Sequence, residues 1–266
     1  MKKFLVSYSW LILLFLYLPM LVLMVYSFND SRINAEWKGF TLHWYTDLFE
    51  NPDVISAFLN TMIIALTATV LSTIIGTLCA LGLHRYKYRF KGAWNGLIYL
   101  PILVPDILMG LSLLILFSQL QLELGKLTII IAHVTFSISF VVVILSARLA
   151  GMGKELEEAA NDLGATPWQT FRYVTFPSLA PGIISAALLT FTLSIDDFVI
   201  SFFVSGPGST TLPLYIYSMV KRGITPEINA LSTILIISIV TLMIASEIFR
   251  SKGDEGEGKR SGQLPL

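Results

Sequence analysis

The sequence has little charge, little histidine and a single cysteine. Only 14% of its 266 residues are charged, whereas 55% are apolar. A water-solvated domain of this size needs a more polar surface, so the composition excludes an ordinary soluble protein and indicates a chain surrounded largely by lipid. The formal net charge is zero, with 18 basic and 18 acidic residues. No basic field exists to attract DNA or RNA, so no nucleic-acid partner is expected.

The motifs of common enzyme classes are also absent from the sequence. Cys79 is alone, which excludes an internal disulfide and disfavours a cysteine metal cluster. No G-x-x-x-x-G-K-[ST] phosphate loop occurs, and residues 151–154 lack its length and its Ser or Thr. The H-E-x-x-H, G-x-S-x-G and dinucleotide-binding patterns are missing as well. We therefore expect neither catalytic residues nor a bound metal or cofactor in this chain.

Long apolar runs dominate what is present. About 20 apolar residues cross a bilayer as a helix, and six runs meet this length, at residues 8–28, 57–83, 95–117, 127–147, 183–204 and 230–248. The sequence predicts an all-α membrane protein whose transmembrane domain covers residues 1–250, followed by a disordered tail at 251–266. We interpret the first run as a retained helix because it is longer than the apolar part of a typical signal peptide and no A-x-A-like cleavage site follows it.

The distribution of Lys and Arg predicts the orientation of the spans. The N-terminus, residues 84–93, residues 148–180 and the tail together hold 13 of the 18 basic residues. Basic loops stay in the cytoplasm. We therefore expect both termini inside a bacterial inner membrane, with loops 29–56, 118–126 and 205–229 outside.

The cytoplasmic segment 153–181 carries helix signals of its own. Its first part predicts a helix whose apolar stripe opposes an acidic face, and Gly164 is expected to end it. Thr166, Pro167 and Gln169 match the cap, first position and capping box of a second short helix. Pro177 and Pro181 are expected to close that helix. The stripe consists of Leu156, Ala159, Ala160 and Leu163.

The same segment resembles the EAA loop of ABC importer permeases. Glu158-Ala159-Ala160, three residues, Gly164 and then Val174-Thr-Phe-Pro177 match the spacing of that motif, with Val174 and Phe176 in place of Ile and Leu. The resemblance implies a type I ABC importer permease fold and a coupling helix that docks on a separate ATPase, which would bind ATP and Mg. It assigns ATPase coupling to Glu158, Ala159, Ala160, Gly164 and Pro177. The alternative is an ordinary amphipathic connector.

Three aspartates lie inside predicted spans, where each is expected to cost about 2.5 to 3.5 kcal/mol. Asp106 and Asp196 are about 17 and 20 Å from the cytoplasmic starts of their spans, hence at similar depth. Asp196 and Asp197 are about 100° apart around a helix, so they do not both face one cavity squarely. One of them is expected to point to a neighbour.

Pro101 and Pro105 precede Asp106 and remove backbone hydrogen bonds if the stretch is helical. Freed carbonyls, carboxylates and aromatic faces would suit a diffuse ammonium ligand. We therefore hypothesise a cationic solute whose pathway includes Asp106, Asp196 and Asp197. The alternative is that these aspartates are neutral or paired structurally. His133, alone in the fourth span, is interpreted as a packed or hydrogen-bonded core histidine.

Further motifs resemble PotC-type permeases of spermidine/putrescine importers. They comprise Pro105-Asp106-Ile107, residues 193–207, residues 211–219 and residues 226–231, and the likeness runs from Tyr26-Ser-Phe-Asn29 onward. The resemblance implies import of polyamines, a PotB-like permease partner, a PotA-like ATPase dimer and an exterior polyamine-binding protein that docks on loops such as 205–229.

Other functions remain open from the residues alone. An ABC permease for a metal cation or thiamine would share the coupling loop. An ion-driven secondary carrier would also keep carboxylates within the membrane but would not need that loop. A structural assembly factor would carry no solute.

Overall fold

The computed structural model describes residues 2–31, 36–86, 89–153, 155–223, 226–238 and 240–241. Across these ranges the regular structure is helical, apart from an isolated bridge between Asn29 and Phe40. The chain divides into two units, Met1–Pro52 with Ile216–Leu266, and Asp53–Tyr215. The all-α fold expected from the apolar runs is confirmed.

The first unit contains α1 (Lys2–Tyr26), α2 (His43–Glu50), most of α11 (Leu212–Arg222) and the helix Pro226–Ser238. Polar side chains fix the turn that follows α1. Ser27 Oγ lies 2.6 Å from Tyr45 Oη, and Trp44 Nε1 donates to the Asn29 carbonyl at 2.8 Å. The side chain of Asn29 in turn donates to the Glu36 carbonyl at 2.8 Å. The segment from Ser27 to Asn29 is therefore a structural anchor for the chain that leads to α2.

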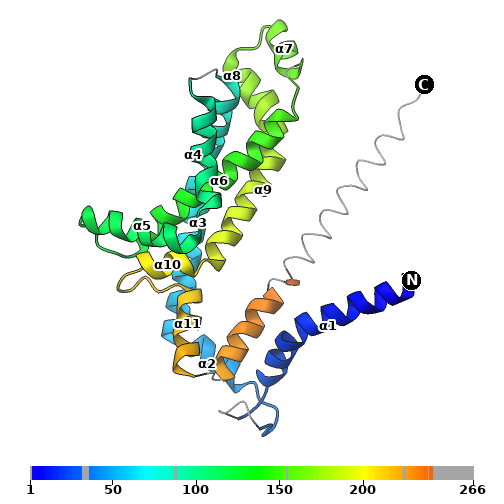
Figure 1. Cartoon of the computed structure of the whole chain (residues 1–266), viewed down its shortest axis with the longest axis vertical. Coiled ribbons are helices and arrows are strands. Elements are labelled where there is room, and N and C mark those ends of the chain that lie inside the picture. The colour runs from blue at the N-terminus through cyan, green and yellow to red at the C-terminus, as the bar shows by residue number, and fades with distance from the viewer. Residues whose placement is uncertain are drawn as a thin grey trace. The chain divides into compact units, whose positions relative to one another are not determined.

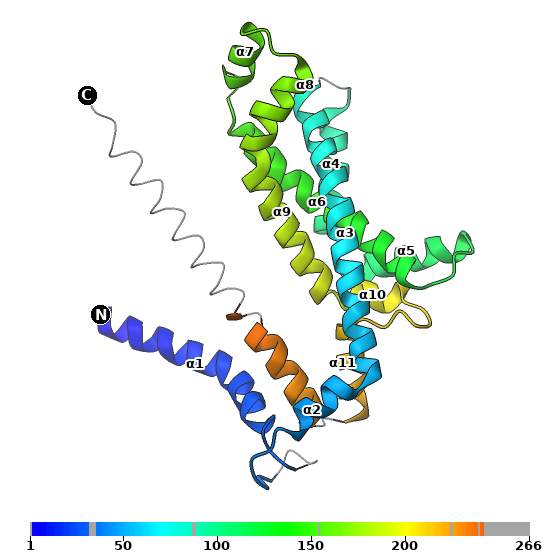
Figure 2. The same cartoon turned by 180° about the vertical axis from the view of Figure 1, so that it is seen from behind.

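The described residues of the second unit form eight α-helices, one π-helix and the start of α11, and the unit is shown in Figure 1. α6 packs against α9, α4 and α10, and α5 packs against α10. Figure 2 shows α7 and α8 at the same end of this unit as the start of α4. The segments are α3 (Pro52–Arg85), α4 (Lys91–Leu103), α5 (Asp106–Gln119), α6 (Lys126–Ala150), α7 (Glu155–Asp162), α8 (Pro167–Thr170), α9 (Phe176–Asp196) and α10 (Val199–Val204), with a π-helix, η1 (Phe171–Thr175), between α8 and α9.

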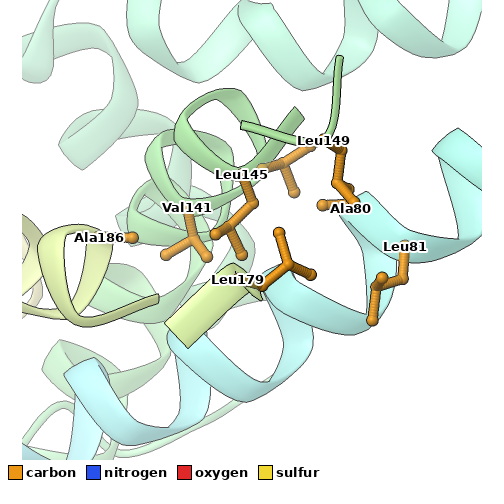
Figure 3. Packing of buried hydrophobic residues seen from close by; sticks show 8 residues of the cluster. Ala80, Leu81, Val141, Leu145, Leu149, Leu179 and Ala186 are labelled. Atoms are coloured by element: carbon orange, nitrogen blue, oxygen red, sulfur yellow. The ribbon is translucent and has the colours of Figure 1, made fainter. Parts of the chain in front are cut away.

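Clusters of buried side chains join the helices in the described part of this unit, and two of them involve α6. The first joins α3, α6 and α9 and is shown in Figure 3; its members are Ala80, Leu81, Val141, Val142, Leu145, Leu149, Leu179 and Ala186. The second joins α3, α5, α6 and α10 through Ile64, Phe117, Ile129, Ala132, Phe136, Ile200 and Val204. α6 contributes to both clusters, so it is the central helix of the unit.

Small residues on α3 allow a close approach to α6. A Cβ atom added to Gly76 would lie 2.6 Å from Val141 Cβ and 3.3 Å from the Ile138 carbonyl oxygen. Ala80, one turn further along α3, is fully buried in the same contact. Gly76 and Ala80 therefore serve helix packing at this part of α3.

Among the described residues, four helices are long and apolar enough to cross a membrane, at Lys3–Tyr26, Pro52–Arg85, Lys126–Ala150 and Pro167–Asp196, and α4 with α5 is a fifth candidate bent by 105°. The sixth expected span, 230–248, overlaps the helix Pro226–Ser238 and extends beyond the described residues. The count of six is consistent with this arrangement and stays a prediction, as does disorder in the tail 251–266, which lies outside the described residues.

The helix that contains most of the fifth expected span runs from Pro167 to Asp196, and a break at Asp197 separates it from α10, which ends at Val204. The bounds of the span within the membrane stay a prediction, but one local expectation is wrong. Pro177 and Pro181 do not close the short helix, because the chain continues through η1 into α9. In η1 the Phe176 amide bonds to the Phe171 carbonyl, five residues back. This wider turn gives the ring of Pro177 room that a regular α-helix would not.

Candidate functional site

Two helix breaks in the second unit face each other across a cavity. The first break lies between α4 and α5, which are bent by 105°. Pro105 lacks an amide hydrogen and disfavours a helical conformation at the residue before it, and Val104 is extended there with ψ 130°. The second break lies at Asp197, extended with ψ 119°, between α9 and α10. Both breaks expose ends of helices inside an apolar segment of the chain.

The cavity between these breaks has a volume of about 320 Å³. Asp106, Asp196 and Asp197, the three aspartates singled out from the sequence, all line it. The volume is at the small end of the range that binds organic ligands. The remaining lining residues are Pro101, Ile102, Phe136, Phe140, Leu193, Phe198, Val199 and Ile200.

Asp197 is the aspartate that turns toward protein neighbours. Its carboxylate accepts from the Ser201 amide at 2.8 Å and from the Ile200 amide at 3.3 Å. It also lies 3.2 Å from His133 Nε2. The carboxylate thus satisfies amide groups of the first turn of α10 that have no partner within the helix. This arrangement agrees with the expectation that one of the adjacent aspartates points to a neighbour.

Asp106 and Asp196 are placed differently. Asp106 is the first residue of α5, Asp196 is the last residue of α9, and both are exposed. Within the described part of the chain neither side chain accepts a hydrogen bond. The estimate of their depth along straight helices does not apply to Asp106, because α4 and α5 form a sharp bend instead of one straight span. Their proximity comes from the bend and from the break after Asp196.

Aromatic side chains supply much of the remaining surface of the cavity. Phe136 and Phe140 come from α6, and Phe198 follows the break after α9. Aromatic faces attract organic cations, particularly where water is scarce. Carboxylates that lack protein donors, placed beside aromatic faces, can bind a positively charged organic group.

A second candidate site lies at one end of the same unit, in residues 153–181, which the EAA resemblance assigns to ATPase coupling and which are called the coupling segment below. α7 ends at Asp162, and Gly164 follows two residues later with a left-handed φ of +84°. The Gly164 amide donates to the Asn161 carbonyl at 2.9 Å and the Ala165 amide to the Ala160 carbonyl at 3.0 Å, which is the Schellman arrangement. Thr166 and Gln169 form the expected capping box, and Pro167 is the first residue of α8. These local predictions are confirmed.

The apolar stripe of α7 is uncovered in the structure. Leu156 is 63% exposed and Leu163 is 89% exposed. Glu158 and Ala159 are exposed as well, whereas Ala160 is half-buried. These two leucines leave apolar surface on this segment that no described residue covers.

A polar contact ties α7 to the end of α3. Arg85 Nη2 lies 2.8 Å from Glu157 Oε1, and the Thr175 hydroxyl of η1 donates to the same carboxylate oxygen. Partial burial alone would raise the pKa of Glu157, but the hydrogen bonds from Thr175 and Arg85 and the positive charge of Arg85 outweigh it and lower that pKa. One carboxylate therefore connects three helical segments.

Sequence reasoning missed the partners at both sites. It found His133 to be a core residue, and the ring is indeed buried and hydrogen-bonded, but it did not connect His133 with Asp197. The available signal was that His133 is an ionisable residue inside an apolar run and that Asp197 is another. Neither Glu157 nor Arg85 was singled out, because the EAA spacing points to Glu158.

Together, the apolar helices, the cavity between two broken helices and the projecting coupling segment define a subunit of a membrane transport system. The family model for the binding-protein-dependent transport system inner membrane component matches residues 72–251, and the chain belongs to this family. This membership places the chain in the inner membrane and among ABC permeases, as expected from the EAA spacing.

Relatives and solved structures agree with this assignment. The chain is 41% identical to the spermidine/putrescine transport system permease protein PotC of Escherichia coli K12, covering 92% of this chain and 94% of PotC. It is 46% identical to the putrescine transport system permease protein PotI of the same strain, covering 84% and 82%. A bacterial alginate ABC transporter solved with a periplasmic protein shares the fold, with a TM-score of 0.71 at 18% identity over 94% of this chain and 93% of that one.

Proposed function

We propose that this chain is one permease subunit of an ATP-driven polyamine importer and forms half of its translocation pathway. The observation that carries the proposal is the cavity at the two helix breaks, where Asp106 and Asp196 have no donor in the described part of the chain and Phe136 and Phe140 lie beside them. Such a lining suits an alkylammonium ion. PotC and PotI, named for transport of spermidine and putrescine, support this solute class.

The lining does not suit a metal ion equally well. A bound divalent cation requires several ligands within about 2.6 Å, and no group of three His, Cys, Asp or Glu side chains within the described ranges is close enough to hold one. The aromatic and aliphatic walls instead match the methylene chain of a polyamine. The relatives likewise do not favour a metal, thiamine or ion-driven transporter.

We infer that α7 docks on a PotA-like ATPase dimer, which binds ATP and Mg. The exposed Leu156 and Leu163 and the rigid turn at Gly164 support this role, with Glu158, Ala159, Ala160 and Pro177 in the same coupling segment. A PotB-like permease would complete the pathway, and a polyamine-binding protein would deliver the solute outside. The alginate transporter solved with its periplasmic protein provides a precedent for such delivery. If both termini are cytoplasmic, α7 also lies on the cytoplasmic side of the membrane, where the ATPase would bind.

Uptake of radiolabelled spermidine and putrescine by the reconstituted complex tests the proposal. Asp106→Asn and Asp196→Asn remove one charge each with little change in shape, so each is expected to raise KM about tenfold or more. Glu123→Gln, at an exposed carboxylate between α5 and α6, is the control. ATP hydrolysis stimulated by the binding protein verifies assembly. Unchanged uptake in both aspartate variants would refute the proposal.

A further inference from the structure

α7 projects from its unit without burying any of its own side chains. It has eight residues, Glu155–Asp162, and none of them is buried. An isolated helix of this length is unstable in water, so α7 depends on contacts with the rest of the unit. Burial of apolar surface contributes little to these contacts, because Leu156 and Leu163 are exposed. The position of α7 therefore depends largely on polar contacts.

The first polar contact is a triangle of Arg85, Glu157 and Thr175. One nitrogen, Arg85 Nη2, donates to Glu157 Oε1 at 2.8 Å and to the Thr175 hydroxyl at 3.2 Å. The Thr175 hydroxyl donates in turn to the same carboxylate oxygen. Thr175 is fully buried, whereas the side chains of Arg85 and Glu157 are 35% and 31% exposed. The triangle joins α7 to η1 and to the end of α3.

A second polar contact lies one turn further along α7. The Thr170 hydroxyl donates to Asn161 Oδ1 at 3.1 Å, and Thr170 is buried at the end of α8. Glu157 and Asn161 are four residues apart, so they lie on the same face of α7. Leu156 and Leu163 lie about 100° or more around the helix from both of them. The face that holds α7 on the unit is therefore separate from the exposed apolar stripe.

We propose that Glu157 and Asn161 are positioning residues for ATPase coupling, which hold α7 on η1 and α8 so that a displacement of α7 moves the helical stretch leading to the cavity. The inference rests on the proposed function, and it assigns a task to residues outside the EAA triplet. Their partners Thr175 and Thr170 both belong to the uninterrupted helical run Pro167–Asp196. The guanidinium group of the triangle passes the same displacement to α3.

The number of polyamine molecules transported per ATP hydrolysed tests this role in proteoliposomes that contain the whole importer. Glu157→Ala removes the acceptor of the Thr175 hydroxyl and releases the Arg85 side chain, so α7 can move without η1 and α9. ATP hydrolysis is expected to stay within about twofold of wild type, while spermidine uptake per ATP falls about fivefold. KM for spermidine is expected to stay within about twofold of wild type, because no residue of the cavity is changed.

Exchange of the two charges tests the cause. Arg85→Glu with Glu157→Arg restores an ion pair around the same hydroxyl group, so uptake per ATP is expected to recover at least about twofold over Glu157→Ala. An exchange without recovery would be contrary. Glu123→Ala removes a carboxylate from an exposed site between α5 and α6 and should keep the wild-type ratio. A merely structural role for Glu157 predicts that uptake and hydrolysis fall together, and an unchanged ratio in Glu157→Ala would overturn the proposal.

Thr170→Val decides the matter if Glu157→Ala does not assemble. It removes the donor to Asn161 with little change in shape, and uptake per ATP is expected to fall about threefold because one neutral hydrogen bond is lost. Thr170→Ser retains the hydroxyl and is expected to retain the ratio. Equal ratios in the two Thr170 variants would overturn the proposal. Absence of polyamine uptake or of ATP hydrolysis by the wild-type complex would instead refute the proposed function.

Discussion

The contact between Gly76 and Val141 allows a quantitative test of how α3 packs on α6. In Gly76→Ala the new Cβ would lie 2.6 Å from Val141 Cβ and 2.7 Å from Val141 Cγ1. A Cβ atom is fixed to the backbone, so no rotamer change moves it away and the helices must separate. Such overpacking costs about 1 to 3 kcal/mol.

Gly82→Ala is the matched control on the same helix, because nothing lies within 4 Å of its added Cβ. Alanine in place of glycine stabilises a helix interior by about 0.5 to 1 kcal/mol. This gain is common to both variants and cancels in the comparison. Gly76→Ala should therefore be less stable than Gly82→Ala by about 1 to 3 kcal/mol.

Thermal unfolding of the purified complex in detergent measures this difference. For a chain of this size, roughly 2 to 4 °C in Tm corresponds to 1 kcal/mol, so the two alanine variants should differ by about 2 to 12 °C. Introducing Val141→Gly removes the obstructing Cβ, and in that background Gly76→Ala should be stabilising. Equal Tm values for the two alanine variants, or a penalty that persists in the Val141→Gly background, would refute the packing argument.

Three further outcomes are expected. The pKa of Glu157 is lower in the folded protein than in the unfolded chain, so its contribution to stability is complete above the ordinary pKa of a glutamate and is lost as the pH falls through the folded value. Glu157→Gln should therefore flatten the dependence of Tm on pH in this acidic range. An unchanged dependence of Tm on pH would contradict this assignment. Gly164→Ala places a side chain at φ +84°, which costs about 1 kcal/mol and favours local opening of the turn by that amount. Hydrogen exchange of the α7 amides should therefore be about fivefold faster, and unaltered exchange would contradict the assigned turn. Asn60→Leu removes the side-chain donor that binds the carbonyls of Gly208 and Thr210. Limited proteolysis of the segment between α10 and α11 should therefore be faster than in the wild type. An unchanged rate of cleavage would show that these hydrogen bonds do not hold the segment.

The local features of the coupling segment follow from the sequence because their causes lie within a few residues. Gly164 adopts a backbone conformation that glycine favours, and the capping box joins Thr166 to a residue three positions away. The sequence does not show that the helix continues past Pro177. Its continuation depends on the π-turn before Pro177, and no residue type within η1 specifies that turn.

The candidate site was predictable in composition and unpredictable in geometry. Aspartates within apolar runs are costly, so Asp106, Asp196 and Asp197 are identifiable from the sequence. Pro105 indicates that a helix is disturbed, but it does not specify a bend of 105°. The contact of His133 with Asp197 joins residues 64 positions apart, and it depends on how α6 packs against α9 and α10.

One continuous helical stretch connects the second part of the coupling segment with the cavity. From Pro167 to Asp196 the chain is helical without interruption, and its 30 residues extend about 45 Å. Thr175, near one end, binds the carboxylate that also holds Arg85, whereas Asp196, at the other end, lines the cavity. In the proposed function, a displacement of α7 would act through Glu157 and Thr175 on this helical stretch, which ends at the cavity. The break at Asp197 would then limit how far that displacement reaches α10, because the backbone helix is interrupted there and the His133 contacts join the two sides instead.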